Sequence, residues 1–257
     1  MTVFLAEGPV SPWKSLAKGM AMVVEEVTLD VSPEGVIAFG MSRDHINALH
    51  VSFPKGAFDR FECPEPLKIT MRIQDLVKVI DNADEEDKAC FFIDQSVDNG
   101  VAINFTGSFS QKYEMHLVDP TNIYKKKGLI APGSTRVKID RMIFKSGLEK
   151  ISKVSEEVNF IAKTTGEFYA AAKTDPIDSI PKGALEFPQS SFANEFICPI
   201  DSSAIYYIDR IISMSKLLNN CTFLEVTFGI NYPLVLMADL DKLGSRIGLM
   251  QGPFTVT

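Results

Sequence analysis

The feature that most constrains the fold is an internal repeat. Aligned with itself at an offset of 131 residues, the chain places Trp13-Lys14-Ser15 on Phe144-Lys145-Ser146 and Gly35 on Gly166. Residues 13–41 give 29 aligned positions with seven identities, where chance gives roughly two. In each copy a helix-like segment leads to a Glu-Glu pair, and two short apolar strands then flank the matched glycine. The repeat predicts two similar halves.

The helix-like segments of both copies are amphipathic at about 100° per residue. Their polar faces carry Lys14, Ser15 and Lys18 in the first copy, and Lys145, Ser146, Glu149, Lys150 and Lys153 in the second. Their inward faces carry Trp13, Leu16, Ala17, Met20 and Val23 in the first, and Phe144, Gly147, Leu148, Ile151 and Val154 in the second. Each copy holds a further candidate helix, at Ile73–Ile80 and Ala204–Leu218.

Strand-like runs lie close together and are joined by short turns, which is typical of antiparallel sheets. In the first half these runs are Val27–Val31, Val36–Met41, Asn47–Phe53, Leu67–Met71 and Val101–Phe105. The helices are too few and wrongly placed for an alternation of strand and helix. The predicted fold class is α+β, with two topologically similar domains of antiparallel sheet and two helices in each.

A linker separates the two halves. Residues 119–133 have Pro or Gly near both ends, no sustained hydrophobic period and a run of three lysines. The predicted organisation is an N-terminal domain at 1–118, a connector at 119–133 and a C-terminal domain at 134–257.

Composition and motifs exclude several classes of protein. The chain is 46% hydrophobic and 23% charged with a net charge of −7, as in globular proteins, and its apolar stretches fall short of the ~18–20 residues that span a membrane. Its four cysteines and three histidines are scattered and predict reduced thiols and no metal site. No nucleotide-binding or hydrolase motif occurs. We expect neither an enzyme nor a cofactor.

Five segments, in their order and spacing, carry a resemblance to a known family: Ser32–Val36, Met41–Leu49, Phe58–Cys63, Lys112–Leu117 and Asn231–Val235. Through them nearly the whole chain resembles the sliding clamps of the proliferating-cell-nuclear-antigen type, found in archaea and eukaryotes. The resemblance implies a ring of three subunits whose helices line a hole around duplex DNA, and an ATP-driven clamp loader that opens it. Two segments depart from the family pattern, residues 174–188 and the C-terminal residues 249–257.

The resemblance gives the polar helix faces a function. On periodicity alone they are ordinary solvated faces, but in a clamp they face DNA phosphates without reading sequence. The same faces hold only Asp81, Glu149 and Asp209 as opposing acids, and we expect most of the acidic excess elsewhere, as in 84–87, beyond the Debye length of about 8 Å. The predicted channel residues are Lys14, Lys18, Lys78, Lys145, Lys150, Lys153 and Lys216.

The resemblance also implies a groove beneath the connector that accepts short hydrophobic peptides from polymerases, nucleases and ligases. For Met41, Ala48 and Pro233, packing in the core or in turns is an equal alternative. Leu129 and Ile130 are adjacent aliphatic residues in an otherwise polar linker, which favours a docking role. The predicted groove residues are Met41, His45, Ile46, Ala48, Leu129, Ile130, Pro233, Leu249, Met250 and Pro253.

Family topology further implies that edge strands of neighbouring subunits pair. The predicted interface residues are Phe109, Lys112, Tyr113, Met115 and Leu117 on one edge, and Ala184 and Leu185, within 183–187, on the other. The predicted function is that of a processivity factor in a homotrimer, located inside the cell: in the cytoplasm or nucleoid of an archaeon, or in a eukaryotic nucleus. One alternative is a subunit of a heterotrimeric clamp, replicative or checkpoint. Another is a duplicated α+β enzyme or ligand-binding protein, which needs a polar pocket with poised titratable groups.

Overall fold

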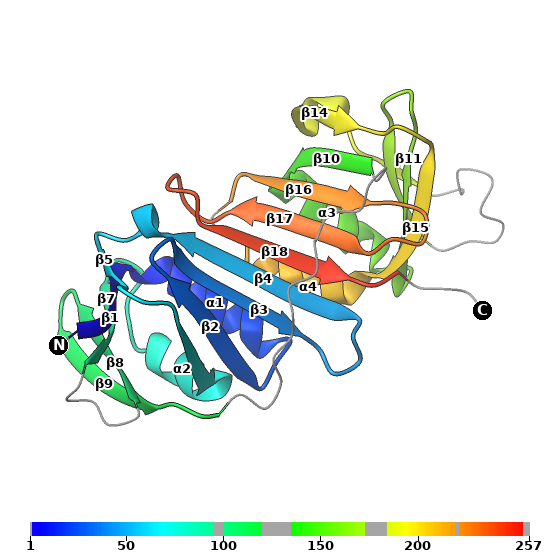
Figure 1. Cartoon of the computed structure of the whole chain (residues 1–257). Helices are drawn as coiled ribbons and strands as arrows, with labels where there is room; N and C mark the ends of the chain where they lie inside the picture. The colour runs from blue at the N-terminus through cyan, green and yellow to red at the C-terminus, as the bar shows by residue number, and fades with distance from the viewer. Residues whose placement is uncertain (1, 95–99, 120–134, 173–183, 219–220, 254–257) are drawn as a thin grey trace. The chain divides into compact units, whose positions relative to one another are not determined.

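The structure is a computed structural model that describes residues 2–94, 100–119, 135–172, 184–218 and 221–253 (Figure 1). The chain divides into two compact units. Unit 1 comprises Met1–Asp44, Ala48–Lys126 and Asp239–Ile247, and unit 2 comprises His45–Asn47, Lys127–Ala238 and Gly248–Thr257. The domain boundaries expected at 118 and 134 stay a prediction, because the connector lies largely outside the described residues.

Unit 1 contains two antiparallel layers and two helices. One layer has the strand order β5-β1-β7-β8-β9, and the other has the order β4-β3-β2-β6. The first layer consists of β1 (Thr2–Pro9), β5 (Arg60–Glu62), β7 (Lys88–Asp94), β8 (Gly100–Thr106) and β9 (Ser110–His116). The second consists of β2 (Glu26–Ser32), β3 (Gly35–Met41), β4 (Asn47–Pro54) and β6 (Leu67–Arg72). The helices are α1 (Val10–Ala21), α2 (Ile73–Ile80) and the short η1 (Lys55–Ala57).

Unit 2 repeats this arrangement strand for strand. Its layers have the orders β14-β10-β16-β17-β18 and β13-β12-β11-β15. The first consists of β10 (Thr135–Asp140), β14 (Phe192–Ile197), β16 (Phe223–Phe228), β17 (Leu234–Asp239) and β18 (Arg246–Gln251). The second consists of β11 (Glu157–Ala162), β12 (Phe168–Ala172), β13 (Leu185–Glu186) and β15 (Ser202–Tyr207). The helices are α3 (Arg141–Ile151), α4 (Ile208–Lys216) and the short η2 (Gln189–Ser191).

The predicted α+β class with two similar antiparallel domains is confirmed. All five predicted strand runs of the first half are strands, and α2 has the predicted bounds. The matched glycines occupy equivalent turns, Gly35 with φ +143° and Gly166 with φ +104°. Backbone in this region is costly for other residues, so both copies need glycine in the turn that leads into their third strand: Gly35 is the first residue of β3, and Gly166 lies two residues before β12.

Two details of the helix predictions are wrong. Residues 204–207 belong to β15, because Ile205, Tyr206 and Tyr207 pair with β11. Tertiary pairing of these β-branched and aromatic residues overrides their helical period. Val154, predicted on the inward face of the helix, is 75% exposed, because α3 ends at Ile151 and the chain leaves the helical path before it reaches Val154. Val23 likewise follows the end of α1 and is half-buried.

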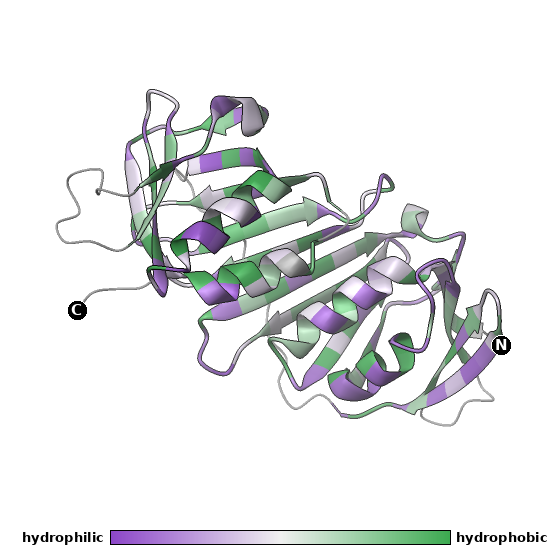
Figure 2. Cartoon of the chain, turned by 180° about the vertical axis from the view of Figure 1, so that it is seen from behind, coloured by the Kyte–Doolittle hydropathy of each residue, from purple (hydrophilic) through white to green (hydrophobic). Residues whose placement is uncertain are grey.

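Each unit has an aromatic core beneath its first helix. In unit 1 the ring of Trp13 stacks on Phe91 with centroids 4.0 Å apart, and it meets Phe53 edge-on at 5.2 Å. In unit 2 the equivalent Phe144 lies 5.8 Å from both Phe160 and Phe187. The hydrophobic and hydrophilic bands of the helices in Figure 2 follow from this burial of one helix face.

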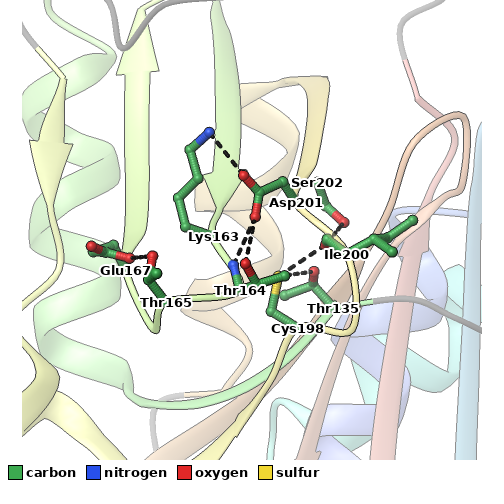
Figure 3. A network of polar contacts seen from close by, with 9 residues as sticks. All are labelled: Thr135, Lys163, Thr164, Thr165, Glu167, Cys198, Ile200, Asp201 and Ser202. Carbon is green, nitrogen blue, oxygen red and sulfur yellow. Dashed lines mark hydrogen bonds and ion pairs between the residues drawn. The ribbon is translucent and has the colours of Figure 1, made fainter.

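A polar latch fixes the turn between β11 and β12 (Figure 3). The Asp201 carboxylate accepts hydrogen bonds from the Thr164 backbone N–H at 2.8 Å and hydroxyl at 3.1 Å, and it lies 3.2 Å from Lys163 Nζ. Chiefly because of the Thr164 backbone bond, the pKa of Asp201 is lowered. Beside it, the Thr165 hydroxyl donates to Glu167, and the Cys198 thiol donates to the Ile200 carbonyl.

Candidate nucleic-acid interface and docking residues

The helices of each unit lie side by side, α1 against α2 and α3 against α4 (Figure 1). In unit 1 the faces of these helices that point away from the core carry the predicted lysines: Lys18 and Lys78 are exposed, and Lys14 is half-buried. Leu16, Met20, Leu76 and Ile80 are buried on the opposite side, so the lysines occupy the polar stripe of each helix.

Each of these three lysines is ion-paired. Lys14 Nζ lies 3.1 Å from Glu85, and its side chain is only 11% exposed. Lys18 lies 3.4 Å from Asp81, and Lys78 lies 3.7 Å from Asp75. The expectation that the acids of 84–87 lie away from the lysines is wrong for Glu85, because the turn after α2 returns it to α1. Sequence reasoning also missed Asp75, although its i,i+3 spacing to Lys78 could have revealed the pair.

Unit 2 leaves more of its lysines unpaired. Lys145 lies 3.7 Å from Glu149, and its side chain is 25% exposed. Lys150 in the last turn of α3, and Lys153 just beyond the helix, are exposed and have no carboxylate within ion-pair distance among the described residues. Lys216 is the last residue of α4, and its side chain lies outside the described part.

Two arginines near these helices escaped the sequence analysis. Arg141 begins α3, and its Nε donates to the Cys221 carbonyl at 3.0 Å. Arg210 in α4 lies over the Tyr207 ring, 5.5 Å from its centroid. Counting arginine together with lysine along each helix would have found both. Each of these arginine side chains therefore has a contact within unit 2, whereas Lys150 and Lys153 have no ion-pair partner among the described residues.

The predicted groove residues differ in exposure. Ala48 and Leu249 are 0% and 1% exposed, so they can support a groove only from beneath. His45 is exposed, and the others in the described part are half-buried: Met41, Ile46, Pro233, Met250 and Pro253.

Within unit 2 the backbone joins two of the predicted groove segments. The Gly252 N–H donates to the Ile46 carbonyl at 2.7 Å, which places the end of the chain beside the segment 45–47. Leu129 and Ile130, predicted as the connector wall of the groove, lie outside the described residues.

The two predicted edge strands lie at the ends of their layers. β9 pairs with β8 in full register from Ser110 to His116, and β13 pairs with β12 through Leu185 and Glu186. No second strand of the same unit pairs with either of them in the described part. On β9, Lys112 and Glu114 are exposed, and Met115 is 6% exposed.

The other residues predicted at the interface lie beside these strands. Phe109 precedes β9 and is 73% exposed, and Leu117 follows β9 and is half-buried. Ala184, just before β13, is also half-buried.

Titratable groups with shifted pKa values do not gather at one place. Burial raises the pKa of the thiols of Cys63, Cys90 and Cys198, and it raises the pKa of the Tyr206 hydroxyl. No cluster of His, Cys, Asp or Glu in the described ranges has the arrangement of a metal site. None of the described helices has both the length and the apolar character needed to cross a membrane.

Comparison with known proteins agrees with this geometry. The family model described as "Proliferating cell nuclear antigen, N-terminal domain" matches residues 7–120. A DNA polymerase sliding clamp of Thermofilum pendens is 24% identical over 243 residues, covering 91% of this chain and 92% of that protein. One of Cenarchaeum symbiosum is 27% identical over 157 residues, and the matched part spans 61% of either protein.

A solved structure, the C-terminal region of FEN-1 bound to A. fulgidus PCNA, superposes with a TM-score of 0.82. It is 16% identical and covers 99% of each chain. The fold is therefore the two-domain fold of sliding clamps. The chain is similar to archaeal DNA polymerase sliding clamps, and the resemblance to the proliferating-cell-nuclear-antigen type is confirmed.

Proposed function

We propose that this chain is a DNA sliding clamp, a non-enzymatic processivity factor that encircles duplex DNA and tethers replication and repair enzymes to it. The observation that carries the proposal is the match of 91% of the chain to an archaeal DNA polymerase sliding clamp. The duplicated units support it, because each offers a pair of helices with a lysine-bearing face. The clamp acts inside the cell, where genomic DNA is.

Encirclement requires a closed ring, and we propose that three chains form it. The open edges of β9 and β13 support this, because pairing them between neighbouring chains removes both exposed edges. A heterotrimer of related chains is the second candidate, favoured by the departure of residues 174–188 from the family pattern. A purified chain with a mass near three times 28.4 kDa supports the homotrimer. A lone monomer at high concentration supports the heterotrimer.

Partner enzymes dock through short hydrophobic peptides. The A. fulgidus clamp with the FEN-1 C-terminal region is a precedent in a related fold. We propose that the groove of this chain includes Ile46, Pro233, Met250 and Pro253, and that Leu129 and Ile130 of the connector, which lie outside the described residues, contribute to docking. Burying one aliphatic side chain is worth ~1.5–3 kcal/mol, so Ile130→Asp should weaken a docked peptide at least about tenfold.

The docking test is calorimetric titration with a hydrophobic clamp-binding peptide. Thr121→Asp is the control, since it adds the same charge to the connector without removing an apolar side chain. Equal peptide affinities of wild type and Ile130→Asp would place docking elsewhere.

The function itself is tested by polymerase extension of a primed circular template with clamp loader and ATP. The expected result is longer products per binding event only when clamp, loader and ATP are all present. Products of unchanged length in the complete reaction would refute the proposed function.

A further inference from the structure

The two helix pairs differ in the charge that they present to solvent. On the surface of α1 and α2, three lysines face three carboxylates: Asp75, Asp81 and Glu85. The formal charge of this set is zero. Asp84 and Glu86, in the turn after α2, are exposed and add two negative charges nearby, and the exposed Arg72 at the start of α2 adds one positive charge.

The surface of α3 has the opposite balance. Lys145, Lys150 and Lys153 are opposed by one carboxylate, that of Glu149, which lies nearest to Lys145. Three positive charges against one negative charge leave an excess of two. Lys150 and Lys153, which carry this excess, are both exposed. On α4, Asp209 and Arg210 carry opposite formal charges, and Lys216, the last residue of the helix, adds one positive charge.

This difference in charge decides which surface can gain binding free energy from contact with DNA. A protein binds duplex DNA largely by releasing the counterions condensed on its phosphates, in proportion to the phosphates that its cations neutralise. A lysine that already neutralises a carboxylate must leave that partner to meet a phosphate, so it brings little net gain. Lys14, at 11% exposure, is also largely covered.

We propose that Lys150 and Lys153 at the end of α3 make the main contacts of this clamp with DNA phosphates. The lysines of the α1–α2 surface contribute little to DNA binding, because carboxylates of the same surface already neutralise them. Each chain therefore binds DNA mainly through unit 2, and the surface of unit 1 repels the DNA only weakly. The inference rests on the proposed function and adds to it a division of work between the two units.

Four double substitutions test the inference by fluorescence anisotropy of a labelled blunt-ended duplex, titrated with NaCl. Lys150→Gln with Lys153→Gln removes the proposed contacts. Lys18→Gln with Asp81→Asn removes one ion pair at constant net charge. Lys55→Gln with Lys242→Gln, at exposed lysines outside the four α-helices, is the control for lost net charge. Asp81→Asn with Glu85→Gln frees Lys14 and Lys18 from their partners.

Each phosphate contact contributes about 0.9 to the slope of log affinity against log salt. The Lys150 and Lys153 substitutions should weaken binding and lower that slope by about 1.8 for each chain of the ring whose two lysines contact the DNA. The ion-pair removal and the charge control should leave the slope at the wild-type value. Release of Lys14 and Lys18 should steepen it.

Two results would overturn the inference. In the first, removing the Lys18–Asp81 pair lowers the salt slope as much as the Lys150 and Lys153 substitutions do. In the second, the salt slope stays at the wild-type value when Asp81→Asn with Glu85→Gln releases Lys14 and Lys18. Loader-dependent processivity of the wild type keeps the two proposals distinguishable. A wild type that supports processivity while all four variants share one salt slope contradicts only the inference. A wild type without processivity contradicts the proposed function itself.

Discussion

Units 1 and 2 share one topology but use it differently. Their strand orders, helix positions and matched glycines correspond, whereas their helix surfaces carry different net charges and their cores are filled differently. Leu16 of α1 corresponds to Gly147 of α3, and the ring of Phe187 lies against that glycine. A duplicated fold can thus conserve its backbone plan while its surface and core chemistry diverge.

The largest effect is expected at the edge strands, where β9 and β13 belong to different units. Tyr113→Pro removes a backbone donor and distorts β9, so we expect the trimer to be lost. Analytical ultracentrifugation at micromolar concentration measures the mass of the assembly and so distinguishes trimer from monomer. Tyr113→Ala keeps the backbone donor and should remain trimeric. A trimeric Tyr113→Pro protein would show that β9 is not the assembling edge.

The next effect tests whether the aromatic cores are equivalent. Trp13 and Phe144 occupy matched positions and are 1% and 0% exposed. Trp13→Ala and Phe144→Ala should each lower the free energy of unfolding by about 3–5 kcal/mol. Urea denaturation gives the value, with Met142→Ala, at a position 58% exposed, as the control. If either substitution lowered the free energy of unfolding by less than about 1 kcal/mol, the two matched aromatic residues would not have the same role in their cores.

A smaller effect, with an informative sign, is expected at Gly147. Glycine to alanine inside a helix ordinarily stabilises by about 1 kcal/mol. Here the new Cβ would lie 2.7 Å from Phe187 Cε1 and 3.0 Å from Cζ, so Gly147→Ala should destabilise by about 1–3 kcal/mol. Gly56→Ala has open space around its Cβ and should not destabilise. A thermally stabilised Gly147→Ala protein would refute the tight contact.

The smallest effect concerns the Asp201 latch, which belongs to unit 2. Because the folded pKa of Asp201 is lowered, its contribution to stability is complete above the ordinary aspartate pKa and is lost as pH falls through the folded value. Asp201→Asn should therefore melt below wild type at neutral pH and approach it in acid. Asp119→Asn, at an exposed site, is the control. A difference that grows in acid would contradict the latch.

Much of this organisation could be predicted from the sequence, because repeat, period and turn residues are local signals. The matched Gly35 and Gly166 indicated two equal units, and the apolar period of Ile73–Ile80 gave the bounds of α2. The division between β15 and α4 could not be predicted, since Ile205 and Tyr206 fit either period until pairing with β11 decides.

The site was less predictable than the fold. The polar helix faces identified the lysines, but their partners depend on where turns lead the chain. Glu85 is 71 residues from Lys14 in sequence and 3.1 Å away in space. No spacing rule connects such residues, so only the folded structure shows that carboxylates neutralise the lysines on the helices of unit 1.

The central claim, topological attachment to DNA, is tested most directly by retention on circular and linear duplexes. The protein is loaded on a nicked circular plasmid with clamp loader and ATP, and gel filtration follows in high salt, which screens the lysine contacts. We predict that it co-elutes with the circle and is lost once a restriction enzyme linearises the plasmid. Equal retention on both forms, or on neither, would contradict encirclement.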